Sequence, residues 1–281
     1  MARPRFVNRL VNPHHSVDDA TLRRAVEGRV VVVTGASHGI GRAVATRLCG
    51  AGAEVVMVAR SAELLDEIAA ELGSHAHALV CDLTDEADVA RLVTAIGERF
   101  GQVDVVVSNA GKSIRRSLAD SYERMHDFTR TMGVNYLGPV QLLLGLLPAM
   151  RARGSGHIVN VSTMGVLIPP APEWSAYLSS KAAFDVWLRS AATEIADDGV
   201  TVSSIYMGLV HTRMSAPGDF EGVPGLKPDQ AADVVCHAIV EHPRVVAPWW
   251  ARAAGAFGSV ARGPSEGLAR RYGRRIGGNS G

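Results

Sequence analysis

Tyr177 and Lys181 are the residues in this sequence best suited to catalysis, because they lie four positions apart in the segment SAYLSSK, residues 175–181. On a helix this spacing places both side chains on one face. Reduction of a carbonyl group needs a proton at the oxygen, and Tyr177 could donate it. The Lys181 ammonium, together with an oxidised nicotinamide, is expected to lower the pKa of Tyr177 towards the working pH. The alternative is a core tyrosine beside a surface lysine.

A glycine-rich loop, TGASHGIG at residues 34–41, follows a β-branched run and precedes an amphipathic segment. Glycines at these positions let the backbone turn tightly and approach a phosphate, while the start of a helix offers unpaired N–H groups. The loop predicts binding of a dinucleotide pyrophosphate, and the alternative is a merely structural turn. The predicted contacts in the loop are Gly35, Ser37, His38, Gly39, Ile40 and Gly41.

The residue after the second predicted strand indicates which dinucleotide binds. Chains that bind NAD usually carry an acid there, which holds the ribose hydroxyls. Here the strand ends in VARS, residues 58–61, and has no carboxylate. Arg60 could form charge-assisted hydrogen bonds to a 2′-phosphate, so NADP(H) is predicted in preference to NAD(H). The alternative is that Arg60 is a solvated surface charge.

These motifs fall in a regular alternation of short apolar runs and longer amphipathic segments. The predicted strands are 30–33, 54–59, 76–80, 103–107, 157–161 and 201–206, and the predicted helices are 40–49, 62–72, 86–100, 123–153 and 174–196. The alternation predicts an α/β fold, a Rossmann-type doubly wound parallel sheet in three αβα layers. Ligands of such sheets bind at the carboxyl ends of the strands, which is where the motifs lie.

The chain of 281 residues, 47% apolar and 20% charged, is expected to form a single domain. We divide it into a basic N-terminal arm (1–27), a catalytic domain (28–247) and a basic, aromatic C-terminal tail (248–281). The tail could lie on an anionic membrane surface, cover the substrate cleft or contact another subunit. Gly255, Gly258, Gly263 and Pro264 are expected to break any long helix there.

Composition excludes several classes of function. With 29 basic and 28 acidic residues, the chain has no overall charge that favours nucleic acid. Its three cysteines have no metal-binding or disulfide spacing, and its histidines suggest no metal site, so a reducing compartment is expected. Without a signal peptide or a stretch of membrane-spanning length, the protein is expected to be soluble and cytoplasmic.

Six motifs in order resemble the short-chain dehydrogenase/reductase family, from about residue 28 to 246. The motifs are the loop at 34–41, Asp82, SNAG at 108–111, Asn135, Ser162-Thr163 and the Tyr177/Lys181 pair. The resemblance implies that Asp82, with Leu83 beside it, contacts the adenine and that residues 207–212 bracket the nicotinamide. It also implies cofactor contacts from Asn109, Ala110, Gly111, Val210 and Thr212. The family usually has Pro-Gly where this chain has Met207-Gly208.

The same resemblance implies a catalytic set of Asn135, Ser162, Tyr177 and Lys181. Asn135 would anchor a water that relays protons to Lys181. The family's catalytic serine lies 13 residues before the tyrosine, whereas Thr163 lies 14 and Ser162 15 residues before Tyr177. Ser162 is favoured by counting back from Gly165, and Thr163 stays the alternative, since either hydroxyl could do the chemistry.

Residues 111–117, 126–132 and 161–174 resemble, more loosely, the reductase domain of actinobacterial fatty acyl-CoA reductases. That resemblance implies an acyl thioester or fatty aldehyde substrate, with Lys112, Arg115 and Arg116 suited to CoA phosphates. The alternative for these three residues is a solvated loop. A hydrophobic ketone or secondary alcohol, such as a sterol, is the alternative substrate, and a non-catalytic NADP(H) sensor is the alternative function. Enzymes of this family are often homodimers or homotetramers.

Overall fold

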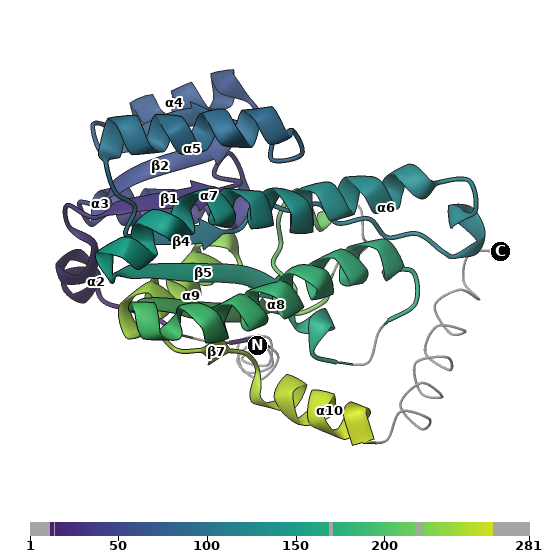
Figure 1. Ribbon diagram of the computed structural model, residues 1–281. Coiled ribbons are helices and arrows are strands. Elements are labelled where there is room, and N and C mark those ends of the chain that lie inside the picture. The colour runs from purple at the N-terminus through teal and green to yellow at the C-terminus, as the bar shows by residue number, and fades with distance from the viewer. Residues whose placement is uncertain (1–11, 14, 169–170, 217–219, 221, 261–281) are drawn as a thin grey trace.

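The computed structural model describes residues 12–13, 15–168, 171–216, 220 and 222–260 (Figure 1). Within them the chain forms one seven-stranded parallel sheet in the order β3-β2-β1-β4-β5-β6-β7. The strands are β1 (Val30–Thr34), β2 (Glu54–Ala59), β3 (Ala76–Val80), β4 (Val105–Ser108), β5 (Gly156–Thr163), β6 (Val200–Met207) and β7 (Val245–Val246). The predicted Rossmann-type α/β fold is confirmed, and its winding reverses between β1 and β4.

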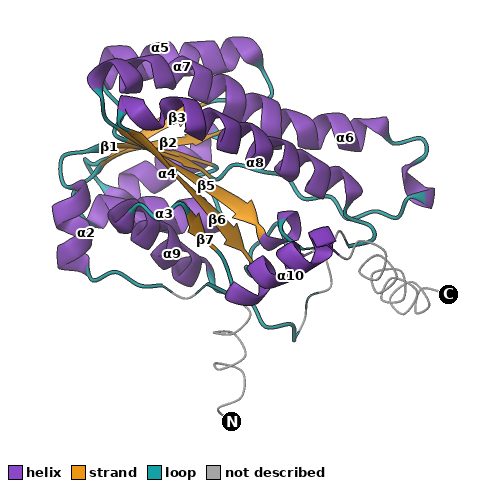
Figure 2. Cartoon of the chain, turned by 60° about the horizontal axis from the view of Figure 1, so that its bottom comes forward, coloured by secondary structure: helices purple, strands orange, loops and turns teal. Residues whose placement is uncertain are grey.

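Helices cover both faces of the sheet, which gives the three αβα layers (Figure 2). On one face lie α2 (Asp19–Val26), α3 (Gly39–Gly50), α4 (Ala62–Leu72) and α9 (Pro228–Glu241). On the other lie α5 (Glu86–Phe100), α7 (Gly138–Arg153) and α8 (Ser175–Ile195). Strands rich in Val, such as β1 with every residue buried, need this cover because both of their surfaces are apolar.

The predicted helix at 123–153 is interrupted. It consists of α6 (Met125–Met132), a π-helical turn η2 (Gly133–Leu137) and α7. A π-helical turn inside a longer helix is uncommon and is often found at functional sites. Here it carries Asn135, and α6 lies against α8 beyond the end of the sheet (Figure 1).

Both ends of the chain differ from expectation where the structure describes them. Within the predicted arm, α2 buries Leu22 and Val26 in the core, while residues 1–11 lie outside the described part. In the predicted tail, α10 (Trp249–Val260) continues through Gly255 and Gly258, so these two glycines do not interrupt it; residues 261–281, with Gly263 and Pro264, lie outside the described part.

One segment, Met125–Arg153, is long and apolar enough to span a membrane by length and composition. The expectation that no stretch reaches such a length is therefore wrong. In the fold, however, α7 packs Leu142, Leu143 and Met150 into the core beside the sheet. A core helix passes the same test of length and composition.

His157 makes acid sensitivity of the fold a testable prediction. Its ring is buried and shares a hydrogen bond of 2.9 Å with Ser203 Oγ. The ring also stacks on that of His242, with the ring centroids 4.0 Å apart. Burial lowers the pKa of His157 from 6.5 to about 3. Below about pH 6.5 the unfolded chain binds a proton that the folded chain cannot, so the free energy of unfolding should fall as the pH falls. Between pH 7 and pH 5 we expect a loss of about 2 kcal/mol from this residue.

Urea unfolding at the two pH values, compared with a His157→Gln variant, measures the contribution of His157. The wild type should lose more stability than the variant on acidification. Equal losses would contradict the prediction.

Candidate active site

A cleft of about 1240 Å³ opens at the carboxyl ends of the strands, where the winding of the sheet reverses. It is lined by the glycine loop after β1, by the ends of β2 and β4, and by Tyr177 and Lys181 from α8. The segment after β6, with Val210 and Thr212, forms another wall of the cleft. Doubly wound sheets bind their ligands at this position.

The glycine loop has the geometry of a phosphate cradle. A Cβ on Gly41 would overlap the carbonyl oxygen of Gly35, and one on Gly35 would lie 2.9 Å from Ala110 Cα. The turn after β4 is hydrogen-bonded to the loop, since Thr34 Oγ1 accepts from the backbone N–H groups of Asn109 at 3.0 Å and Ala110 at 2.9 Å. Helix α3 begins here without a side-chain cap from His38, so its first N–H groups are available to an anion.

At the other end of the cleft, Arg60 and Asp82 face each other across 4.0 Å. The Arg60 side chain is 76% exposed, and Asp82 accepts from the backbone N–H and the hydroxyl of Thr84. Leu83 is buried beside them and also lines the cleft. Arg60 thus lies on the cleft at the end of β2, where the sequence predicts the ribose of the adenosine.

Asn135 joins the turn after β4 to helix α8. Its amide donates to Lys112 O and to Ser180 Oγ, both at 2.9 Å, and its Oδ1 accepts from Lys112 N at 2.8 Å. A Cβ on Gly111 would lie 3.1 Å from Asn135 Oδ1 and 3.5 Å from Lys181 Nζ. The absence of a side chain at Gly111 therefore lets Asn135 and helix α8 approach the turn after β4. Ser180, to which the sequence pattern assigned no role, orients the amide of Asn135.

Lys181 is buried, and its Nζ donates to Val161 O at 3.1 Å. Burial lowers the pKa of Lys181 from 10.5 to about 8, because an ammonium group loses its hydration inside the protein. The side chain can therefore give up or accept a proton close to neutral pH. A fixed surface charge could not do this as readily.

Burial of the Tyr177 hydroxyl raises the pKa of Tyr177 from 10.0 to about 12, and a hydrogen bond between the Thr163 and Tyr177 side chains opposes the rise. The direction is opposite to the fall predicted from the Lys181 spacing. Without a cofactor, desolvation of the phenol raises the pKa of Tyr177 more than the hydrogen bond with Thr163 lowers it. The phenol of Tyr177 therefore stays protonated at neutral pH.

Of the two hydroxyls at the end of β5, Thr163 is the one whose hydrogen bond lowers the pKa of Tyr177. Ser162 Oγ is buried and has no hydrogen-bond partner among the described residues, although the residue borders the cleft. Successive side chains of a strand point to opposite faces, so only one of the two hydroxyls at the end of β5 can face Tyr177. The preference for Ser162, based on counting residues, is therefore not supported by the geometry.

The basic residues predicted for CoA phosphates are largely engaged in ion pairs. Arg115 Nε lies 2.6 Å from Glu173, and Arg116 Nε lies 2.8 Å from the buried carboxylate of Asp127. Arg124 also pairs with Asp127, and these two arginines lower its pKa against the effect of burial. Glu173 has a φ of 71°, which is costly for a residue other than glycine. These pairs fasten the wall of the cleft, and of the three predicted cations only Lys112 has no ion pair in the described part of the chain.

Aromatic residues that sequence reasoning did not assign to the site form its outer wall. Trp174 stacks on Phe220 with ring centroids 6.2 Å apart and meets Tyr177 edge-on at 6.0 Å. Both Trp174 and Phe220 line the cleft. Only their position in the fold shows this, because they come from two different loops.

The arrangement is that of an oxidoreductase. It combines a phosphate cradle, a long cleft and a tyrosine acid beside a buried lysine. The cradle formed by Gly35 and Gly41 and the length of the cleft fit NAD(P)(H), which the glycine loop, Arg60, Asp82 and residues 109–111 would hold. When bound, this cofactor supplies the hydride.

Comparison with known proteins gives the family. The short chain dehydrogenase family model matches residues 29–219. A fatty acyl-CoA reductase of Acinetobacter baylyi is 42% identical over 247 residues, which cover 86% of this chain and 83% of that protein. The chain therefore belongs to the short-chain dehydrogenase family and is an NAD(P)-dependent oxidoreductase.

Solved structures of the same family have been determined with either cofactor. A 3-ketoacyl-(acyl-carrier-protein) reductase from Brucella melitensis, complexed with NADH, is 29% identical with a TM-score of 0.71, covering 78% of this chain and 95% of that one. A metagenomic short-chain oxidoreductase in complex with NADP is 32% identical with a TM-score of 0.67, covering 77% and 92%.

Proposed function

We propose that this protein is an NADPH-dependent carbonyl reductase that acts on a fatty acyl-CoA or a fatty aldehyde. The observation that carries the proposal is one cleft at the carboxyl ends of the strands, which Thr163, Tyr177 and Lys181 line together. The fatty acyl-CoA reductase from Acinetobacter supports the substrate class, because it matches most of this chain.

In this mechanism the Thr163 hydroxyl and the Tyr177 hydroxyl both hydrogen-bond the carbonyl oxygen of the substrate. As hydride reaches the carbonyl carbon, Tyr177 donates its proton to the developing alkoxide. Lys181, whose pKa is lowered to about 8, returns a proton to the phenolate. Asn135 is a positioning residue here, because its amide holds the Lys112 turn and Ser180 beside this path.

With a thioester substrate, hydride adds to the acyl carbon and gives a hemithioacetal. The carbon–sulfur bond then breaks, the thiol leaves with a proton, and an aldehyde remains. The apolar wall of the cleft suits an acyl chain, since Trp174 and Phe220 line it together with Met164, Ile168 and Met214. An aldehyde or ketone would need only the hydride and proton steps.

The test is to mix the purified protein with NADPH and, separately, a long-chain acyl-CoA, a fatty aldehyde and a cyclic ketone, and to follow the nicotinamide absorbance. Free thiol is measured in parallel. We expect oxidation with the acyl-CoA accompanied by thiol release, or with the aldehyde. Oxidation with the cyclic ketone alone would replace the proposed substrate with a hydrophobic ketone or secondary alcohol.

The preference for NADPH is proposed to depend on Arg60. Replacing it with Glu should raise the Kd for NADPH about a hundredfold, because a charge-assisted hydrogen bond is lost and a carboxylate then faces the 2′-phosphate. The Kd for NADH should change little, so the preference reverses. Fluorescence titration with both cofactors measures this, with Arg23→Glu on α2, an exposed arginine far from the cleft, as the control. An unchanged preference would contradict recognition at Arg60.

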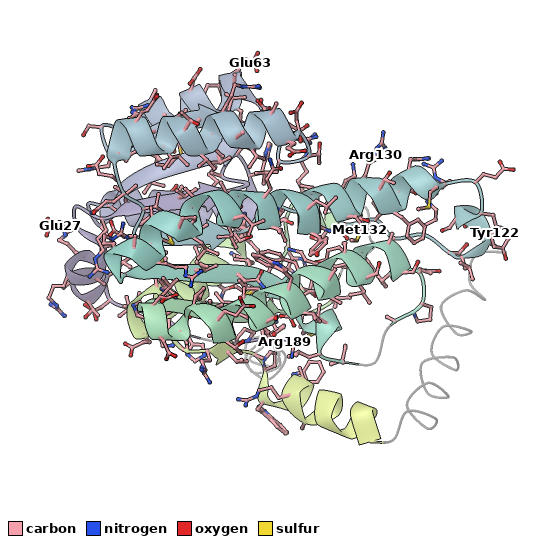
Figure 3. The ribbon with its side chains drawn as sticks, in the orientation of Figure 1. Glu27, Glu63, Tyr122, Arg130, Met132 and Arg189 are labelled. Carbon is pink, nitrogen blue, oxygen red and sulfur yellow. The ribbon has the colours of Figure 1, made fainter. Side chains whose placement is uncertain are left out.

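We also propose a cytoplasmic homo-oligomer, a dimer or tetramer, with a peripheral membrane contact through the C-terminal tail. All three cysteines are free and buried, as suits a reducing compartment. Leu137 and Leu144 around α7 and Val186 on α8 are exposed, which suits a contact between subunits. Trp249, in that tail, is 71% exposed at the start of α10, and this helix lies at the edge of the molecule (Figure 3). Aromatic residues at such positions suit the membrane interface.

A further inference from the structure

Two loops far apart in the sequence, the glycine loop and the segment after β6, meet over the N-terminus of α3. Arg213, in the segment after β6, places its Nη1 3.4 Å from His38 Nε2 in the glycine loop. One residue away in each loop, a Cβ on Gly39 would lie 3.1 Å from Thr212 Cγ2. The φ of Gly39 is +54°, which a side chain would strain further. The close approach therefore depends on glycine at this position.

The loop that carries Arg213 is held by its own hydrogen bonds. Ser215 Oγ accepts from Thr212 N at 3.0 Å and donates to Val210 O at 2.9 Å. Val210 forms an isolated parallel bridge with Leu226, whose N–H donates to Leu209 O at 2.8 Å. Arg213 thus projects from an ordered turn, and its position over α3 is built into the fold.

The partner of Arg213 is a poor match for its charge. His38 Nδ1 lies 3.0 Å from Ser37 Oγ, so the ring accepts from Arg213 at Nε2 when it donates to Ser37 at Nδ1. No carboxylate of the described residues forms an ion pair with Arg213, although it is exposed at the cleft. By contrast Arg115, which also lines the cleft, has an acidic partner, as do Arg116 and Arg124.

We propose that Arg213 is a cofactor-binding residue that, with His38, contacts the pyrophosphate of NAD(P)(H) and fastens the loop after β6 over it. An exposed guanidinium beside uncapped helix N–H groups is a strong donor set for a phosphate. Arg213 exchanges an imidazole ring for an anion when the cofactor binds. The same loop carries Thr212 and Val210, so the contact also orders the wall of the cleft near the reacting carbon.

This role differs from that proposed for Arg60. The pyrophosphate is common to NADPH and NADH, whereas the 2′-phosphate belongs to NADPH alone. Loss of Arg213 should therefore weaken both cofactors, and loss of Arg60 should weaken one. The inference depends on the NAD(P)(H) dependence of the family and is independent of the carbonyl substrate.

The experiment is a binding titration of the full chain, without substrate, with NADPH and with NADH. Arg213→Ala should raise both Kd values about tenfold, and Arg213→Lys should recover part of the loss because it keeps the charge but not the planar donor pair. Arg60→Ala should raise only the Kd for NADPH. Arg23→Ala, which removes an exposed arginine from α2, is the matched control and should change neither.

Thermal unfolding of each variant without cofactor confirms that the fold is intact. Kd values for Arg213→Ala within twofold of the wild type for both cofactors would overturn the proposal. A loss confined to NADPH would overturn it too, because it would assign Arg213 to the 2′-phosphate.

Discussion

Replacing Tyr177 with Phe is expected to lower kcat/KM for carbonyl reduction by about a thousandfold or more. The change removes only the hydroxyl that donates the proton and keeps the aromatic ring that lines the cleft. The Kd for NADPH should change by less than about twofold, because the charged ends of the cofactor are held elsewhere in the cleft. Steady-state kinetics and a binding titration measure the two quantities.

Tyr122→Phe is the matched control, since it removes the same hydroxyl from an exposed tyrosine at the outer end of the molecule. It should leave both quantities unchanged. If Tyr177→Phe kept more than about a tenth of the wild-type kcat/KM, the tyrosine would not be the acid. If NADPH binding were lost as well, the effect would be on the cleft itself.

Thr163→Val is expected to lower kcat/KM about a hundredfold, as the loss of one hydrogen-bond donor to a developing oxyanion typically does. Valine keeps the branched shape of threonine at the end of β5, so the strand should be unaffected. Ser162→Ala should change kcat/KM by less than about threefold. Removal of a buried hydroxyl that has no partner among the described residues should cost little stability.

Thr163→Ser tests whether the hydroxyl itself is responsible, and it should keep most of the activity. Kinetics of the three variants with one substrate decide between the two positions. A large loss from Ser162→Ala together with a small loss from Thr163→Val would return the role to Ser162.

The fold could be predicted well because its signals are local. Runs of Val and Ile, glycine turns and amphipathic periods are written in short stretches of sequence, and each predicted strand exists in the sheet. The strand β7 was missed because two residues, Val245 and Val246, carry no pattern. Helix α9 was also missed, although Pro228 at its first turn is a typical start signal.

The site could be predicted only in part, because some of its properties arise from contacts between distant segments. Arg115 was read as a free cation, yet its partner Glu173 lies 58 residues away. The pKa of Tyr177 was predicted from its spacing to Lys181, whereas burial by the surrounding fold raises it. Likewise, an insertion before Tyr177 obscured the register of Ser162 and Thr163, which only the strand geometry distinguishes.

Transfer of a deuterium label tests the central claim most directly, namely that the cleft holds NADPH and carbonyl carbon together beside Tyr177. NADPH deuterated at the reactive ring carbon is incubated with the protein and with the acyl-CoA, aldehyde and ketone in turn, and the products are examined by mass spectrometry. Deuterium on the former carbonyl carbon of at least one product, absent with Tyr177→Phe, is the predicted result. Saturable NADPH binding with no labelled product from any of these substrates would contradict the account.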